Sequence, residues 1–224
     1  MDLLELTPRL HLLRFPVGQA YLWRDGADLT LVDTGPAGSA PAVAAAVQRL
    51  GTLRRVVLTH FHDDHTGSAA EIGAWPGVTV LAHRADAPII RGDRPGPPPD
   101  FTDAERELHA RVAHGLPPAP PARVDVELEG GEELDIGAGA RVLHVPGHTD
   151  GSIGLHLVAE GVLVTGDVIA EHGGELMLGP FNLDRERAAA SMRLLAALDV
   201  EIACFGHGDA VVGGAGERLR HLHG

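Results

Sequence analysis

The sequence contains one cysteine, few aromatic residues and no long apolar run. The single cysteine, Cys204, excludes an intramolecular disulfide framework and is typical of a protein in a reducing cytoplasm. Cys204 stands in the apolar run Ile202–Phe205, which indicates a buried, inert thiol rather than a ligand or a nucleophile. Because aromatic residues make up 4% of the chain and hydrophobic residues 44%, we expect an interior built mainly from Ala, Val and Leu.

Basic residues are also scarce. Lys and Arg total 18 against 31 Asp and Glu, and a formal net charge of −13 argues against a general nucleic-acid binder, which would carry a basic surface. The N-terminus lacks the basic and apolar segments of a signal peptide, and no apolar run approaches the roughly 20 residues that span a membrane. We therefore expect a cytoplasmic protein without a nucleic-acid or membrane partner, and the sequence is compatible with a homo-oligomer.

The hydrophobic pattern indicates alternating strands and helices in a chain of 224 residues, long enough for one large domain or two small ones. Short β-branched and apolar runs predict strands over 11–13, 20–23, 29–32, 54–59, 78–82, 124–128, 141–145, 152–158, 162–165 and 201–205. Capping residues and helical spacing predict helices over 42–50, 68–74, 102–114, 184–198 and 217–222. Two successive β-rich units, each followed by helices, favour two sheets packed face to face with helices outside.

Residues 92–122 interrupt this pattern. Two proline-rich tracts, Gly92–Pro99 and Leu116–Pro121, flank a segment in which Thr102 and Glu105 have the spacing of a capping box that opens a helix. The prolines make a stiff frame rather than a flexible linker. The insertion is either a lid over a site or a spacer, and the sequence favours neither interpretation.

The densest group of metal-ligand side chains follows the predicted strand 54–59. His60, His62, Asp64 and His65 stand close together, and imidazole and carboxylate are ligands that zinc and similar divalent metals accept. In an extended loop, residues 60 and 62 point the same way, so both imidazoles can reach one ion. Asp64 and His65 lie further round the turn and suit a second ion. A His-rich surface loop is the alternative.

Three further strand ends supply one candidate ligand each. His148, Asp167 and His207 each come one residue after a glycine, where a predicted strand has just ended. Sites in layered folds assemble where chains leave a sheet, so we expect these side chains to serve the same site as the 60–65 loop.

Together these motifs resemble those of the metallo-β-lactamase-fold superfamily, in its glyoxalase II-like, general hydrolase branch. The resemblance is carried by the HxHxDH segment 60–65, Pro146–Ser152, Thr165–Asp167, Gly206–His207 and the earlier segment Leu31–Gly35. It implies an α/β (α+β) fold, a four-layer αββα sandwich of two mixed β-sheets flanked by helices. Residues 1–224 would form one such domain, with the segment at about 92–122 as an insertion and candidate lid.

The resemblance also implies two bound divalent metal ions, with zinc favoured and iron or manganese as alternatives. One ion would be held by His60, His62 and His148, and the other by Asp64, His65 and His207. Asp167 would bridge them. Two ions that share a water lower its pKa to about 7, which supplies hydroxide for hydrolysis at neutral pH.

Other residues receive roles by the same resemblance or by their position. Asp64 is a candidate catalytic residue that orients the hydroxide or protonates the leaving group, although ligation alone would explain it. Asp33 would lie behind the ligands and orient their loop, and its alternative is a turn residue at a strand end. His83 and His172 are candidate pocket residues. Among the remaining histidines, we expect a surface or helix position for His11, His109, His114, His221 and His223, and a packed position within strands for His144 and His156.

The implied function is that of a metal-dependent hydrolase (EC class 3) that uses a metal-bridging hydroxide on an ester, thioester or lactone of a small molecule. A mononuclear iron enzyme resembling the persulfide dioxygenases is the alternative from another reaction class. A β-lactamase is less favoured because Asp167 stands where the zinc–cysteine pattern has Cys, and a nuclease because of the acidic charge. A metal-binding scaffold without activity is disfavoured because no ligand is missing.

Overall fold

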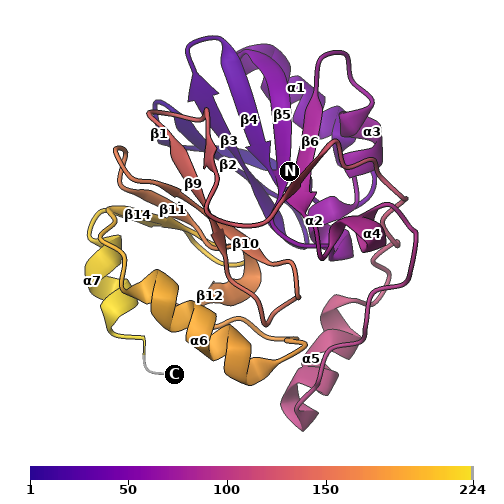
Figure 1. Ribbon diagram of the computed structural model, residues 1–224, viewed down its shortest axis with the longest axis vertical. Coiled ribbons are helices and arrows are strands. Elements are labelled where there is room, and N and C mark those ends of the chain that lie inside the picture. Colours follow the sequence, from indigo (N-terminus) through magenta and orange to yellow (C-terminus); the bar gives the residue numbers. More distant parts are fainter. Residues whose placement is uncertain (223–224) are drawn as a thin grey trace. The chain divides into compact units, whose positions relative to one another are not determined.

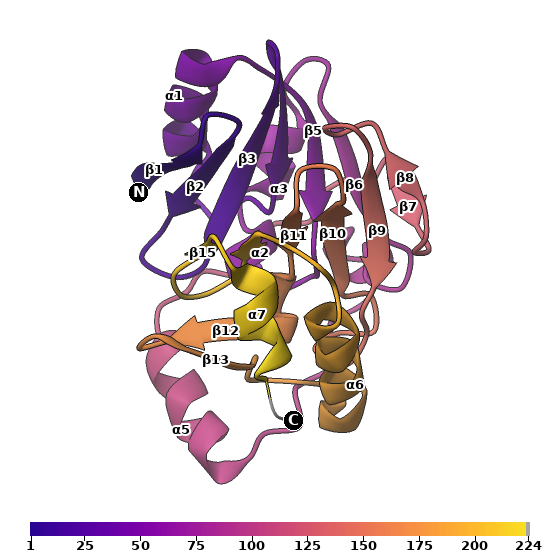
Figure 2. The same ribbon diagram turned by 90° about the vertical axis from the view of Figure 1, so that its left-hand side faces the viewer.

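The computed structural model describes residues 1–222, which form two compact units. The first unit comprises Met1–Gly96 and Leu116–Glu129, and the second comprises Pro97–Gly115 and the chain from Gly130 onward. Figures 1 and 2 together label the helices and strands of both. Among residues 1–222, no helix is both long enough and apolar enough to cross a membrane.

Within the described residues, the first unit is built on a seven-stranded mixed sheet whose neighbouring strands follow the chain order (Figures 1 and 2): β1 (Asp2–Thr7), β2 (Leu10–Arg14), β3 (Gln19–Asp25), β4 (Asp28–Val32), β5 (Thr52–Leu58), β6 (Thr79–His83) and β7 (Val126–Leu128). Strands β1 to β4 form an antiparallel meander, whereas β4 to β7 run parallel. The carboxyl ends of β4, β5 and β6 therefore lie at one edge, and the loops that follow them meet there.

The helices of this unit cover one face of the sheet and supply part of its loops: α1 (Ala40–Leu50), α2 (Asp63–Thr66), α3 (Ala69–Gly73) and α4 (Ala87–Ile90). Val43 of α1 and Ile72 of α3 share one hydrophobic core with Leu31, Val56 and Val80 of the sheet, and all five are fully buried. Burial of each such side chain contributes about 1.5–3 kcal/mol. This core holds the strand ends that carry the ligand loop.

In the described part of the second unit, six strands form a mixed sheet in the order β15–β14–β11–β10–β9–β8: β8 (Glu133–Leu134), β9 (Ala140–His144), β10 (Ile153–Leu157), β11 (Val162–Val164), β14 (Ile202–Cys204) and β15 (Val211–Val212). The β11–β14 pair is parallel and the other pairs are antiparallel. Since β9 and β11 both run antiparallel to β10, the carboxyl ends of β9, β11 and β14 share one edge. A single turn, η1 (Gly166–Val168), and the hairpin β12 (Ile169–His172) and β13 (Glu175–Leu178) follow β11.

Helices α6 (Arg185–Ala196) and α7 (Ala215–Arg220) pack on this second sheet (Figure 2). Leu195 of α6 and Leu219 of α7 share a core with Val145, Leu163 and Phe205, and each of these is fully buried. As predicted, Asp184 caps α6, because its side chain accepts a hydrogen bond from the Arg187 N–H. Cys204 is buried in β14, and burial raises the pKa of its thiol, which confirms the inert role.

The helix of the insertion, α5 (Asp103–Val112), belongs to the second unit. Its predicted capping box is present, with reciprocal hydrogen bonds between Thr102 and Glu105. The Glu105 carboxylate also accepts from the Phe181 N–H at 3.2 Å and from the Arg185 guanidinium. The ring of Phe101 packs against His109 and Phe181 at centroid distances of 4.9 and 5.9 Å. The helix is therefore fixed to the segment that precedes α6, and its role as a lid stays a prediction.

The predicted fold class is confirmed, since the chain has two large mixed sheets flanked by helices. The predicted strands and helices are present, with ends displaced by a few residues. The prediction for His11 was wrong, because this residue lies in β2 with 5% exposure, and burial lowers the pKa of its imidazole against the opposing effect of Glu5. His144 lies in β9 as predicted, but its side chain is exposed rather than packed.

Candidate metal centre

The ligand loop of the first unit starts where the buried strand β5 ends. His62 has an extended backbone (φ −65°, ψ 150°) and precedes the short helix α2, which carries Asp64 and His65. The imidazole of His60 lies 4.8 Å from that of His62 and 4.2 Å from that of His65, between ring centroids. The ligand atoms of His60 and His62 lie within 4.8 Å of each other, and so do those of Asp64 and His65. The first unit thus gathers its predicted ligands in one place.

Asp33, at the end of β4, fixes this loop from behind. Its buried carboxylate accepts from the Thr59 N–H and the Thr59 hydroxyl, both at 2.8 Å, and its Oδ2 lies 2.9 Å from Nδ1 of His65. The Thr59 Oγ1 in turn lies 2.9 Å from Nδ1 of His60. Asp33 holds a left-handed backbone (φ 60°), a conformation that Asp tolerates better than most residues.

This network decides which nitrogen of each imidazole carries the proton. A carboxylate only accepts, so Nδ1 of His65 donates to Asp33. The single hydroxyl proton of Thr59 also goes to Asp33, so the Thr59 oxygen accepts from Nδ1 of His60. In both neutral rings the lone pair is therefore on Nε2, which is the arrangement that a metal-binding histidine needs.

Gly18, in the turn before β3, shapes the position of Asp64. Gly18 has a φ of 69°, and a Cβ placed there would lie 3.0 Å from both the carbonyl oxygen and the Oδ2 of Asp64. The same carboxylate lies 3.5 Å from Nε2 of His65. The turn at Gly18 therefore packs directly against the residue predicted to act both as a ligand and as a catalytic group.

The second unit brings its own three candidates together. Oδ2 of Asp167 lies 3.7 Å from Nε2 of His148 and 3.2 Å from Nε2 of His207. His148 is fully buried and Asp167 is 7% exposed, whereas the His207 side chain is 38% exposed. A carboxylate set between two imidazole nitrogens is a donor arrangement that suits a divalent cation. The donor sets of both units fit metal binding.

The segment 179–184 supports these ligands through the backbone. The Leu183 N–H donates to the His148 carbonyl at 3.2 Å, and the Asp184 N–H donates to that of Gly147 at 2.9 Å. Gly179 lies so close to Asp167 that a Cβ would stand 1.8 Å from the Asp167 carbonyl oxygen. The site therefore depends on a glycine that carries no functional group.

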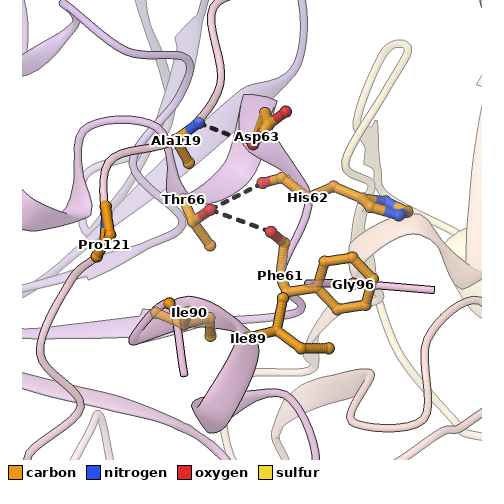
Figure 3. A pocket seen from close by; sticks show the side chains of 10 residues that line it. Phe61, His62, Asp63, Thr66, Ile89, Ile90, Gly96, Ala119 and Pro121 are labelled. Atoms are coloured by element: carbon orange, nitrogen blue, oxygen red, sulfur yellow. Dashed lines mark hydrogen bonds between the residues drawn. The ribbon is translucent and has the colours of Figure 1, made fainter. Parts of the chain in front are cut away.

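A cavity of about 270 Å³ opens beside the ligand loop of the first unit (Figure 3). Its lining residues come from the ligand loop, from α4 and from the two ends of the insertion: Phe61, His62, Asp63, Thr66, Ile89, Ile90, Gly92, Gly96, Ala119 and Pro121. Figure 3 shows Phe61 close to Ile89, and Asp63 joined to Ala119.

The two predicted pocket histidines do not belong to this lining. His83 is 4% exposed at the end of β6, where its Nε2 lies 3.3 Å from the Glu129 carbonyl, so its pocket role receives no support from this cavity. His172 is exposed on the β12–β13 hairpin of the second unit, and its role stays a prediction. His109 lies on α5, His114 and His221 are exposed, and His156 is buried in β10, as expected, while His223 lies outside the described residues.

The chain belongs to the metallo-beta-lactamase superfamily, whose family model matches residues 13–207. The match covers the candidate ligands of both units. It confirms the predicted superfamily and the predicted class of enzyme, a hydrolase.

Individual relatives agree with this membership. The chain is 32% identical over 183 residues to a hydroxyacylglutathione hydrolase of Cereibacter sphaeroides, a match that covers 80% of this chain and 57% of that relative. A metallo-beta-lactamase family protein of Thermus thermophilus, TTHA1429, has a similar structure, with a TM-score of 0.70, 25% identity and coverage of 96% of this chain and 78% of that chain. TTHA1623 in a di-iron-bound form is also similar, with a TM-score of 0.68, 27% identity and coverage of 92% and 96%.

Several residues of the site could not be singled out from the sequence. Thr59 looks like the last residue of an apolar strand, and only the fold shows its hydroxyl linking Asp33 to His60. Gly18 and Gly179 matter because a side chain at either position would collide with the site. In the sequence, each is visible only as a glycine near a turn. Alternating polar and apolar residues of a strand and the glycines of a turn can be recognised in a short stretch of sequence. Contacts between distant segments cannot.

Proposed function

We propose that the chain is a metal-dependent hydrolase with a dinuclear zinc centre, which acts on an ester, thioester or lactone bond of a small molecule. The proposal rests on a buried hydrogen-bond network around Asp33. Asp33 contacts Nδ1 of His65 directly, and Thr59 links Asp33 to Nδ1 of His60. A carboxylate behind an imidazole fixes the ring and raises its basicity as a ligand. A His-rich surface loop would not require this buried arrangement.

The ligand assignment follows the superfamily. His60, His62 and His148 would hold one ion, Asp64, His65 and His207 the other, and Asp167 would contact both. The geometry within each unit supports this assignment, since Asp167 stands next to His148 and His207 in the second unit and the 60–65 side chains converge in the first.

Two divalent ions held by these residues would supply hydroxide at neutral pH and positive charge beside a substrate carbonyl. The residues of the chain supply the positioning. Asp33 keeps the rings of His60 and His65 in one orientation, and Gly18 packs against Asp64. Asp64 is our candidate catalytic residue, which orients the hydroxide or protonates the leaving group in addition to its role as a ligand.

The relatives support the choice of reaction. One similar protein is a hydroxyacylglutathione hydrolase, a name that describes cleavage of an acyl group from glutathione, although this chain spans only 57% of its length. Iron is the alternative metal, because a solved relative with 27% identity is described as a di-iron form. We further propose a single domain over the whole chain, a cytoplasmic location, and a small-molecule substrate without a nucleic-acid or membrane partner.

The proposal is tested by replacing Asp167, the residue that contacts both ion positions in this assignment. We expect Asp167→Ala to lose more than half of the bound metal and nearly all turnover of ester, thioester or lactone substrates, because the remaining donors no longer share a carboxylate. The matched control is Asp199→Ala, an exposed aspartate of the second unit, which should retain both properties. Full activity in the Asp167→Ala protein would contradict the dinuclear assignment.

A further inference from the structure

The cavity beside His62 is lined by apolar side chains together with polar groups of His62, Asp63 and Thr66. Phe61, Ile89, Ile90, Ala119 and Pro121 supply apolar side chains to its lining. Its volume of about 270 Å³ lies just below the roughly 300–1,000 Å³ of sites that hold a whole small molecule. The cavity therefore suits part of a substrate rather than a whole one.

The charge of the lining comes from one carboxylate. Within the described chain, Asp63 is the only carboxylate among the lining residues, and neither Lys nor Arg is among them. The Asp63 Oδ1 accepts from the Ala119 N–H at 2.8 Å, which holds the carboxylate at the lining (Figure 3). The cavity therefore offers an entering group apolar walls and one fixed carboxylate.

The walls of the cavity are fixed in place. The Phe61 N–H donates to the buried Asp86 carboxylate at 3.1 Å, and the Thr66 hydroxyl bonds the Phe61 and His62 carbonyls at 3.2 and 3.0 Å (Figure 3). Opposite, the Ala122 N–H donates to the Ile90 carbonyl at 2.9 Å, which joins the second proline tract to α4.

Gly96 lies directly against the Phe61 ring, because a Cβ at this position would stand 2.6 Å from the ring. A pocket that is formed in advance loses little ordering entropy when a group enters it.

We propose that this cavity is the specificity pocket for the acyl group of the substrate, and that it selects small apolar acyl groups. The inference rests on the proposed hydrolase function. It follows from the position of His62, which is at once a candidate ligand and a lining residue, so an acyl chain in the cavity has its carbonyl end beside the ligand loop. The two ends of the 92–122 insertion thus determine which substrate is accepted.

Kinetics on a series of 4-nitrophenyl esters from acetyl to decanoyl test the inference with the metal-loaded enzyme. We expect kcat/KM to rise about threefold to fourfold for each methylene until the cavity is full, because each methylene leaves water for an apolar wall.

Ile89 lies half-buried in the wall. Ile89→Phe should shift the optimum to shorter chains, with a loss of about tenfold on hexanoyl and little change on acetyl, and Ile89→Ala should shift it to longer chains.

The control pair is Leu194→Phe and Leu194→Ala, at a residue that is 50% exposed on α6 of the second unit. Neither change should move the chain-length optimum. An optimum that stays in place in both Ile89 variants while hydrolysis continues would overturn the acyl-pocket inference and leave the hydrolase proposal intact.

A binding measurement separates the two proposals. Hexanamide, an uncharged mimic of the acyl group, is titrated into the same protein while the ¹³C-labelled methyl groups of Ile89 and Ile90 are followed by NMR. We expect saturable chemical-shift changes in the methyl signals of both residues. In the Ile89→Phe protein, the affinity for hexanamide reported by Ile90 should be at least tenfold weaker. Such shifts without turnover of any ester, thioester or lactone would support the apolar pocket and contradict the hydrolase proposal. Absence of the shifts would overturn the pocket, whatever the enzyme hydrolyses.

Discussion

At the scale of single residues, the site depends on side chains that are not themselves ligands. Asp33 is the clearest case, because one carboxylate fixes His65 directly and His60 through Thr59. The resemblance to the superfamily implies that Asp33 orients the ligand loop, and the structure supplies the hydrogen bonds that such a role needs. The ligand rings and their supports form one connected group.

Asp33→Asn should weaken metal binding by about 10- to 100-fold, the usual effect of losing a carboxylate behind a metal-binding histidine. The amide can no longer accept every proton that the carboxylate accepts, so the tautomers of His60 and His65 are no longer fixed. Competition against a chromophoric zinc chelator measures the affinity. Asp28→Asn, at an exposed aspartate of the same strand, is the control, and equal affinities in the two variants would contradict the orienting role.

A pair of glycines separates backbone strain from contact with the site. Gly18 and Gly26 both have positive φ, but a Cβ at Gly18 would meet Asp64 whereas one at Gly26 would enter open space. Both Gly→Ala changes should therefore cost roughly 1–2 kcal/mol of stability from the left-handed backbone. Gly18→Ala should in addition lower kcat/KM by tenfold or more through displacement of Asp64. Denaturant unfolding and ester kinetics check this, and equal activity of the two variants would rule out a role for the Gly18 turn.

At the scale of elements, the sequence predicts the helices and strands that have short-range signals. The helix α5 is an example, because the Thr102–Glu105 capping box is a short-range signal. The hairpin β12–β13 was missed, although Gly173 and Gly174 between two short strands are a local hairpin signal. The strand β1 was also missed, because its edge position leaves half of its side chains exposed and no alternating pattern results.

The contact between α5 and the segment 179–184 makes stability depend on pH. Burial by itself raises the pKa of Glu105, but the hydrogen bonds from Thr102, Arg185 and Phe181 outweigh it and lower the pKa to about 2. A folded-state pKa below the unfolded value means that the stabilisation is complete above about pH 4.5 and is lost as the pH falls towards 2.

Glu105→Gln should therefore destabilise the protein by about 1–3 kcal/mol at pH 7, because the charged hydrogen bonds are weakened. The difference from the wild type should shrink as the pH falls from 4.5 towards 2. Urea unfolding at pH 7 and at pH 3 measures it. Glu107→Gln, on an exposed position of the same helix, is the control, and a difference that does not change with pH would contradict the assigned contacts.

At the scale of the whole molecule, strand order explains why candidate ligands distant in the sequence meet at one edge of each sheet. β4, β5 and β6 present Asp33 and the 60–65 loop at one edge of the first sheet, and β9, β11 and β14 present His148, Asp167 and His207 at one edge of the second. The sequence predicts these residues because each follows a strand. It could not predict the glycine contacts or the cavity, which depend on how separate segments pack.

Bound metal should also stabilise the whole fold, because ions that bind only the native state shift unfolding by mass action. We expect dialysis against a chelator to lower the melting temperature by roughly 10 °C, which corresponds to about 4 kcal/mol in a chain of this size. Zinc should restore it. In the Asp167→Ala protein the chelator should change the melting temperature by much less, and an equal shift in both proteins would contradict a centre that depends on Asp167.

The central claim, a dinuclear hydrolase centre, is tested most directly by the metal content of the protein purified without added metal. Plasma mass spectrometry on the wild-type chain gives the metal and its stoichiometry in one measurement. We predict about two zinc ions per chain, together with turnover of ester, thioester or lactone substrates that disappears on chelation. About one iron per chain, with oxygen uptake in the presence of a persulfide, would contradict this account and assign the chain to oxygen chemistry.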